Sequence, residues 1–320
     1  MPNQTPEPSP DSLDALKLPG GRNAASELLD KAASGDIDAL LTLDKHGFIM
    51  GKSETPEAFT GRLRTLAAKL GKMQDELDKN GKFDIDDVTV YARDRIPDKL
   101  FAEATEADSR LFGFSIDWVP GFFIDPFFLF GGCAFTYYPD FFAMFIIRRS
   151  FRHSPKWFIY KRKELLAHEL CHIARIGLES ESFEETFAYQ TATSPFRRLL
   201  GGLFLKPMDS YLLLTSAFLL LLGQIVRTYL IPNLPIGVFW GILLLSILWL
   251  SLRYMHLMNI LKRAKNNMEM LWGDNAMKAL FRCSDDEVRK WASFKSEADA
   301  RAWLDAQGVR WKVIAAVAAK

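Results

Sequence analysis

The chain has few cysteines, no excess of either charge and no internal repeat. Its 320 residues hold three scattered cysteines, Cys133, Cys171 and Cys283. An odd, scattered set argues against a disulfide framework and fits a reducing compartment. The formal net charge of +1 gives no electrostatic case for nucleic acid, so we expect no nucleic-acid partner.

The first residues lack the pattern of a secretory signal. Met1 to Pro19 is polar and rich in proline, with neither a basic start nor an apolar stretch. We therefore expect no cleaved leader. Residues 1–21 are predicted to be a disordered segment.

A mostly helical region is predicted over residues 22–111. Residues 22–50 and 56–79 carry apolar side chains at helical spacing, and residues 78–81 read as a turn. The turn superficially resembles a calcium loop, but positions 76 and 87 match that loop poorly, so a plain turn is favoured. A strand is expected at Val88–Tyr91.

One pentapeptide has the spacing of a metal-binding motif. It is His168-Glu169-Leu170-Cys171-His172, which reads H-E-x-x-H. On a helix, positions four apart share one face, so both imidazoles can reach a single metal ion. Glu169 then lies beside them as a candidate base. Catalytic zinc takes three protein ligands and one water, so a third ligand is needed.

The third ligand is sought in a second helix, over residues 183–193, after a break at residues 180–182. The first helix is expected over 158–178, with Gly177 as its stop. Glu184 and Glu185 both lie at a workable distance from His172, and either could ligate. Glu185 is preferred because it begins the pattern E-x-x-A.

H-E-x-x-H followed by a helical E-x-x-A resembles the gluzincin clan of zinc metallopeptidases, over roughly residues 130–195. The resemblance implies a zincin-like catalytic domain over 112–205 that binds Zn²⁺. His168, His172 and Glu185 would be the metal ligands, and Glu169 would be the general base on the zinc-bound water. Membrane gluzincins often carry an acidic residue directly after E-x-x-A, where this chain has Tyr189, so the groups that orient the ligands must differ here.

The segment before the motif is expected to form strands. Residues 112–149 are rich in aromatics but are interrupted by Gly, Pro and Asp, which excludes a spanning helix. In zincins an edge strand precedes the metal helix and pairs with substrate. Residues 141–147 or 134–138 could fill that role, or both could be core strands. Tyr137 or Tyr138 is a candidate oxyanion donor.

Arg175 lies one turn beyond His172. It is expected to pair with Glu181, Glu184 or Glu185. The alternative is a surface charge without a function.

Two long apolar runs follow, at about 210–230 and 234–252, joined by a Pro-containing turn. Each can cross about 30 Å of hydrocarbon, so a transmembrane hairpin is predicted over 210–252. A hairpin confined to one leaflet is the alternative. Basic residues flank both outer ends, namely Arg197, Arg198, Lys206, Arg253, Lys262, Arg263 and Lys265. The positive-inside rule then places both termini and the catalytic domain in the cytoplasm, on a multi-pass protein of the inner (cytoplasmic) membrane.

Residues 253–320 are predicted to form a helical cytoplasmic region. Ser284 opens a capping box, and Ser296 begins a further helix that ends at Gly308. Four tryptophans are expected to pack rather than to bind a ligand: Trp272, Trp291, Trp303 and Trp311.

The sequence thus predicts an α+β protein, with a zincin-like metallopeptidase domain, a transmembrane helical hairpin and flanking helical segments. The expected function is zinc-dependent peptide-bond hydrolysis by a cytoplasm-facing, membrane-anchored metalloendopeptidase. Its partners would be the lipid bilayer and protein or peptide substrates, with membrane-associated ones favoured by location. A non-proteolytic zinc hydrolase and a non-catalytic membrane adaptor with an incidental motif are the alternatives. The region before residue 112 could also cover the cleft.

Overall fold

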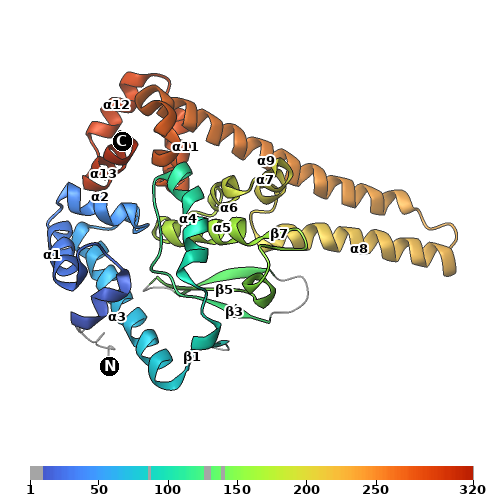
Figure 1. Cartoon of the computed structure of the whole chain (residues 1–320). Helices are drawn as coiled ribbons and strands as arrows, with labels where there is room; N and C mark the ends of the chain where they lie inside the picture. Colours follow the sequence, from blue (N-terminus) through green and yellow to red (C-terminus); the bar gives the residue numbers. More distant parts are fainter. Residues whose placement is uncertain (1–9, 86–87, 126–130, 138–140, 320) are drawn as a thin grey trace, which may run out of the picture.

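The computed structural model describes residues 10–85, 88–125, 131–137 and 141–319. It is a mixed α+β fold in which helices dominate, and two long helices project from one side of a rounded body (Figure 1). The N-terminal helices lie on the opposite side of that body (Figure 1).

The N-terminal helices are η1 (Pro10–Leu16), α1 (Gly21–Ala33), α2 (Ile37–Lys45) and α3 (Pro56–Asn80). The predicted disorder is wrong from residue 10 onward, because Leu13, Leu16 and Leu18 are buried in the core. Residues 1–9 lie outside the described part. The single helix predicted over 22–50 is also wrong. Gly35 has a φ of +84°, and Asp36 caps α2 by accepting the Ala39 N–H at 2.8 Å.

The turn predicted at residues 78–81 is wrong in its extent, because α3 continues to Asn80 and only Gly81 leaves the helix, in the left-handed conformation at a φ of 71°. β1 (Lys82–Ile85) follows and pairs antiparallel with β2 (Val88–Tyr91), which confirms the predicted strand. The chain then passes through η2 (Ala92–Asp94) into α4 (Asp98–Phe112).

The central sheet has the strand order β3-β5-β4. β3 (Gly121–Ile124) runs parallel to β5 (Phe142–Arg148), and β4 (Gly132–Tyr137) runs antiparallel to it. Both predicted strands are therefore confirmed, although Tyr138 lies outside the described residues. The proposal that residues 141–147 pair with substrate is wrong, because both sides of β5 are occupied by neighbouring strands. Among the described residues, β4 is the edge strand on this side of the sheet.

The motif lies on α5 (Arg162–Arg175), which packs against α4 (Figure 1). The helix begins later than predicted, because residues 156–161 form a small hairpin of β6 (Lys156–Trp157) and β7 (Tyr160–Lys161) after η3 (Arg149–Arg152). Gly177 is not the stop. The chain continues through η4 (Ile176–Leu178), and Glu179 takes the left-handed conformation at a φ of 51°. The expected second helix is α6 (Glu184–Ala188), extended by η5 (Tyr189–Thr191).

Two helices are long and apolar enough to cross a membrane. After α7 (Pro195–Leu203), α8 (Pro207–Tyr229) and α9 (Ile236–Trp272) form an antiparallel pair that extends from the body (Figure 1). Only 22% and 17% of their most apolar windows are buried, unlike the core helices of soluble proteins. The predicted end at residue 252 is not a helix end, because α9 continues into the C-terminal region.

The C-terminal region is helical, as predicted, and its elements are η6 (Gly273–Asn275), α10 (Ala276–Phe281), α11 (Asp285–Ser293), α12 (Glu297–Asp305) and α13 (Val309–Ala318). The Ser284 capping box is confirmed. The tryptophans do pack together, since the Trp291 ring lies 5.4 Å from Trp272 and 5.8 Å from both Trp303 and Trp311.

A buried ion pair connects the two ends of the chain. The Arg282 guanidinium donates from Nε to Asp44 Oδ1 across 2.9 Å, and neither side chain is more than 5% exposed. This pair fastens α10 to α2. The N-terminal and C-terminal helices therefore form one body that supports α5 and α6.

Candidate metal centre

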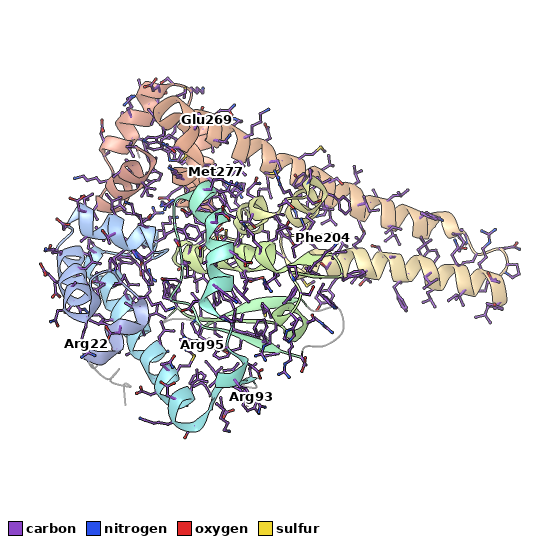
Figure 2. The ribbon with its side chains drawn as sticks, viewed as in Figure 1. Arg22, Arg93, Arg95, Phe204, Glu269 and Met277 are labelled. Atoms are coloured by element: carbon purple, nitrogen blue, oxygen red, sulfur yellow. The ribbon has the colours of Figure 1, made fainter. Side chains whose placement is uncertain are left out.

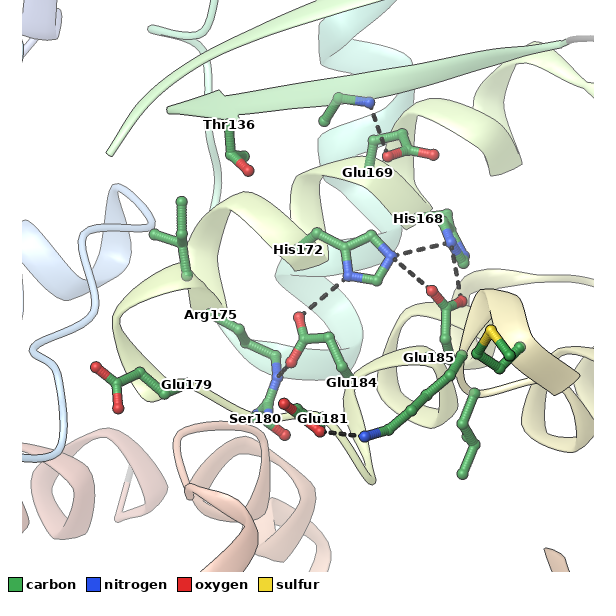
Figure 3. Close-up of a pocket in the computed structure, with 15 residues that line it drawn as sticks. Thr136, His168, Glu169, His172, Arg175, Glu179, Ser180, Glu181, Glu184 and Glu185 are labelled. Carbon is green, nitrogen blue, oxygen red and sulfur yellow. Dashed lines mark hydrogen bonds and ion pairs between the residues drawn. The ribbon is translucent and has the colours of Figure 1, made fainter. Parts of the chain in front are cut away.

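The two motif histidines extend from one face of α5. Leu166, Ala167 and Leu170 on the other face are completely buried in the core, which fixes the rotation of the helix. His168 and His172 are one turn apart, and their Nε2 atoms lie 3.1 Å from each other (Figure 3). The predicted convergence of the two imidazoles is present.

Glu185 is brought to the same point by α6. The chain reverses after α5, and completely buried Phe183 and Phe187 anchor the short helix on the core. One Glu185 oxygen lies 3.5 Å from His168 Nε2, and the other lies 3.6 Å from His172 Nε2 (Figure 3). His168, His172 and Glu185 are a group whose ligand atoms all lie within 4.8 Å of one another.

Glu184 lies on the opposite side of the His172 ring. Its Oε1 is 3.1 Å from His172 Nδ1, and its Oε2 accepts a bond from Arg175 Nε at 2.7 Å. When the Nδ1 proton points to this carboxylate, the lone pair of Nε2 faces His168 and Glu185. Glu184 is therefore an orienting group, which sequence reasoning missed. The signal for it was a second acid beside Glu185, in a chain that has Tyr189 where an orienting acid was expected.

Arg175 is buried behind the site, and its side chain has no solvent exposure. Of the three partners expected from the sequence, it pairs with Glu184. Its other nitrogens donate to the carbonyls of Phe281 and Cys283, the latter at 3.3 Å. The end of α10 and the residues just after it thus fix the position of Arg175, which in turn binds Glu184.

Several carboxylates surround the imidazoles, and the pKa values reflect them. Burial alone would lower the pKa of His172, but the hydrogen bond and charge of Glu184, with Glu185 and Glu169, raise it to about 9. Burial raises the pKa of Glu169 and of Glu185. Burial and the neighbouring His172 hold the pKa of His168 well below its usual value. This local excess of negative charge favours a cation between the side chains.

Glu169 faces the edge strand. Its Oε2 accepts the backbone N–H of Ala134 in β4 at 3.0 Å (Figure 3). Along an antiparallel strand, successive residues point their N–H and C=O groups alternately toward and away from the partner strand. The Ala134 N–H is one that points away from β5. The candidate base and the free edge of the sheet therefore meet at one point.

A cavity of about 770 Å³ opens over these groups. Ala134 and Thr136 line one side of it, and Leu205, Lys206 and Met208 line the end at the base of α8. The lining residues are Ala134, Thr136, His168, Glu169, His172, Arg175, Ile176, Glu179, Ser180, Glu181, Glu184, Glu185, Leu205, Lys206 and Met208.

Two further expectations about this cavity are not supported. Tyr137 does not line it, because its ring packs on Phe142 with 5.9 Å between centroids, and Tyr138 lies outside the described residues. In the part of the chain that the structure describes, no residue before Ala134 lines the cavity, so the region before residue 112 does not cover the cleft.

The donor set suits zinc. Zinc takes imidazole nitrogen and carboxylate oxygen at about 2.0–2.2 Å, so tetrahedral geometry places the ligand atoms about 3.4 Å from one another. The contacts among His168, His172 and Glu185 are 3.1, 3.5 and 3.6 Å. Calcium and magnesium prefer sites made of oxygen alone, so the two imidazoles argue for a transition metal.

Comparison of the chain with family models, with curated proteins and with solved structures finds no match. The chemistry of the site is therefore inferred from its own geometry.

Proposed function

We propose that the protein is a membrane-anchored zinc metalloendopeptidase. The observation that carries the proposal is the convergence of His168, His172 and Glu185 on one point, with Glu169 next to a free strand edge. This convergence supports the zincin-like arrangement that the H-E-x-x-H and E-x-x-A motifs imply. Two imidazoles and one carboxylate leave room for a fourth ligand, as hydrolytic zinc sites require.

Zinc held there would polarise the scissile carbonyl and make a water molecule acidic near neutral pH. Glu169 would act as the general base, taking a proton from the attacking water and giving it to the leaving amine. Burial raises the pKa of the Glu169 carboxyl, which brings its proton affinity closer to that needed near neutral pH.

The substrate is a polypeptide in an extended conformation. The outer edge of β4 can pair with a peptide backbone laid along the cavity, beside the Ala134 N–H that already donates to Glu169. Strand pairing contacts only the backbone of the substrate, so it allows many substrate sequences. Specificity then depends on the side chains at the ends of the cavity.

α8 and α9 are proposed to span the bilayer as a hairpin. At its base, Arg253 pairs with Asp209 across 2.6 Å, which ties the two helices together where they leave the body. The basic flanks place this end on the cytoplasmic side of an inner membrane, so both termini and the cavity face the cytoplasm. Membrane-associated proteins and peptides are then the nearest substrates.

A Glu169→Gln variant tests the proposal. It should keep zinc, because Glu169 is not a ligand, and it should lose hydrolysis of a mixed peptide library by at least the 10²–10⁴-fold typical of a general base. Glu179→Gln is the matched control, since Glu179 lines the same cavity without contacting the imidazoles. Hydrolysis by Glu169→Gln at the wild-type rate would contradict the assignment.

The wild-type protein distinguishes the alternative functions. Bound zinc without any peptide hydrolysis would favour a non-proteolytic hydrolase, and protein without zinc would favour an adaptor.

A further inference from the structure

Exposed apolar side chains gather at the base of the two long helices. Outside α8, α9 and the turn that joins them, the described residues include five large hydrophobic side chains that are exposed. One is Tyr91, and the other four are Phe158 at 66%, Ile159 at 57%, Phe196 at 65% and Leu199 at 49%. The last four form the surface that we call the interfacial patch.

The interfacial patch comes from two neighbouring elements. Phe158 and Ile159 form the tip of the β6–β7 hairpin, and Phe196 and Leu199 lie one turn apart on α7. Lys161 in β7 donates to Thr193 Oγ1 at 2.7 Å, and the Arg197 guanidinium lies 5.9 Å from the centre of the Tyr160 ring. The hairpin and the start of α7 therefore hold each other in place.

α7 is fastened to the point where the long helices begin. It ends at Leu203, shortly before α8 begins at Pro207. Arg253 in α9 donates to the Leu203 carbonyl at 3.1 Å with the same guanidinium that binds Asp209 in α8. The elements that carry the patch therefore lie at the base of the hairpin, and Figure 1 shows α7 and β7 beside it.

We propose that the interfacial patch inserts into the boundary between headgroups and acyl chains of the bilayer that α8 and α9 cross. This inference rests on the proposed membrane anchor. Phe and Leu are typical of the apolar face of a helix that lies in the plane of the interface, with that face buried at the boundary of headgroups and acyl chains. Exposed Lys156 and Arg198 flank the patch and suit anionic headgroups.

The patch also fixes the position of the cavity relative to the lipid surface. Leu205, Lys206 and Met208 line one end of the cavity; the first two lie between α7 and α8, and Met208 is in the first turn of α8. With the patch at the lipid surface, this end of the cavity opens at headgroup level. If the proposed function holds, polypeptide segments next to the bilayer are the nearest substrates.

Depth-dependent fluorescence quenching on the full chain tests the insertion. In a Cys133→Ser background the other two cysteines are buried, so Phe158→Cys or Phe196→Cys can carry a single polarity-sensitive dye. Vesicles of phosphatidylcholine and phosphatidylglycerol carry nitroxide quenchers either near the headgroup or near the chain end. Phe218→Cys in α8 is the control for a spanning position, and Arg22→Cys on α1, at the other end of the molecule (Figure 2), is the control for an aqueous one.

We expect dyes at 158 and 196 to lose fluorescence mainly to the shallow quencher, the dye at 218 mainly to the deep one, and the dye at 22 to neither. Quenching at 218 without quenching at 158 and 196 would overturn the insertion while the anchor stands. No quenching at 218 would overturn the anchor and the inference with it. A dye at 158 that becomes shielded in detergent as protein concentration rises would instead assign the patch to a second copy.

The same series in a Glu185→Ala background separates this inference from the proposed function. Loss of zinc or of hydrolysis should leave the quenching unchanged, because insertion requires only the patch and the hairpin. Quenching that disappears with Glu185 would contradict the inference.

Discussion

Arg175 donates from Nε to Glu184 Oε2 across 2.7 Å, and the other oxygen of that carboxylate meets His172 Nδ1 at 3.1 Å. Burial raises the pKa of Glu184, but Arg175 and His172 outweigh it and hold the pKa of that carboxyl below its usual value. The carboxylate therefore stays charged and keeps the imidazole in one orientation. A buried arginine, fixed by carbonyls from the C-terminal region, thus sets the direction of a proposed metal ligand.

Removing the negative charge of Glu184 should weaken the metal site. In Glu184→Gln, His172 loses its charged partner, so we expect zinc affinity to fall about 10- to 100-fold. Competition with a chromogenic chelator measures the affinity. Glu181→Gln is the control, because that exposed glutamate pairs with Lys206 and touches neither histidine. Equal affinities for Glu184→Gln and wild type would show that Glu184 has no orienting role.

Breaking the ion pair between Asp44 and Arg282 should strongly destabilise the body, because one buried charge loses its partner. Asp44→Asn leaves the Arg282 guanidinium buried without its counter-charge, and we expect a loss of about 3–5 kcal/mol. Denaturant unfolding of the full chain in detergent, followed by tryptophan fluorescence, measures this loss. Asp38→Asn, on the exposed face of the same helix, should change little. Similar midpoints for the two variants would contradict the prediction.

Asp285 should make one edge of the cavity sensitive to acid. Burial raises its pKa, but hydrogen bonds from Ser180 and from the backbone N–H groups of Ser182 and Glu181 outweigh it and hold that pKa below the usual value. A group whose pKa is depressed by folding stabilises the fold above its unfolded pKa, about 3.9, and loses that effect as pH falls through the folded pKa. Residues 179–182 should therefore remain ordered near neutral pH and loosen in acid below about pH 4.

Hydrogen exchange of residues 179–182 at several pH values measures this ordering. Asp285→Asn should exchange faster near neutral pH and should lack the extra loosening below about pH 4. An identical pH response in the variant and the wild type would contradict the role of Asp285.

The sequence predicts the local features of this protein well. The spacing within H-E-x-x-H places His168 and His172 on one face of a helix, and Ser284 opens a helix as its capping box implies. These features depend on residues a few positions apart, where helix geometry and side-chain capping decide the outcome.

Features that depend on contacts between residues far apart in the chain could not be predicted from the sequence. Leu16 is buried although its surroundings in sequence are polar and rich in proline, because α3 provides its packing partner. Composition alone could not show that β5 lies between β3 and β4, which makes β4 the edge. Arg175 finds the Phe281 and Cys283 carbonyls more than a hundred positions away in the chain. Glu184 and Glu185 are neighbours in sequence, and only the rotation of α6 separates their roles.

Zinc content of the purified full chain tests the central claim most directly. Plasma emission spectrometry on wild type, His168→Ala, Glu185→Ala and Glu179→Gln should find about one zinc per chain in the first and last proteins and little in the other two. Circular dichroism confirms that each variant is folded. A folded Glu185→Ala protein with the zinc content of wild type, or a wild type that does not retain zinc, would contradict the account.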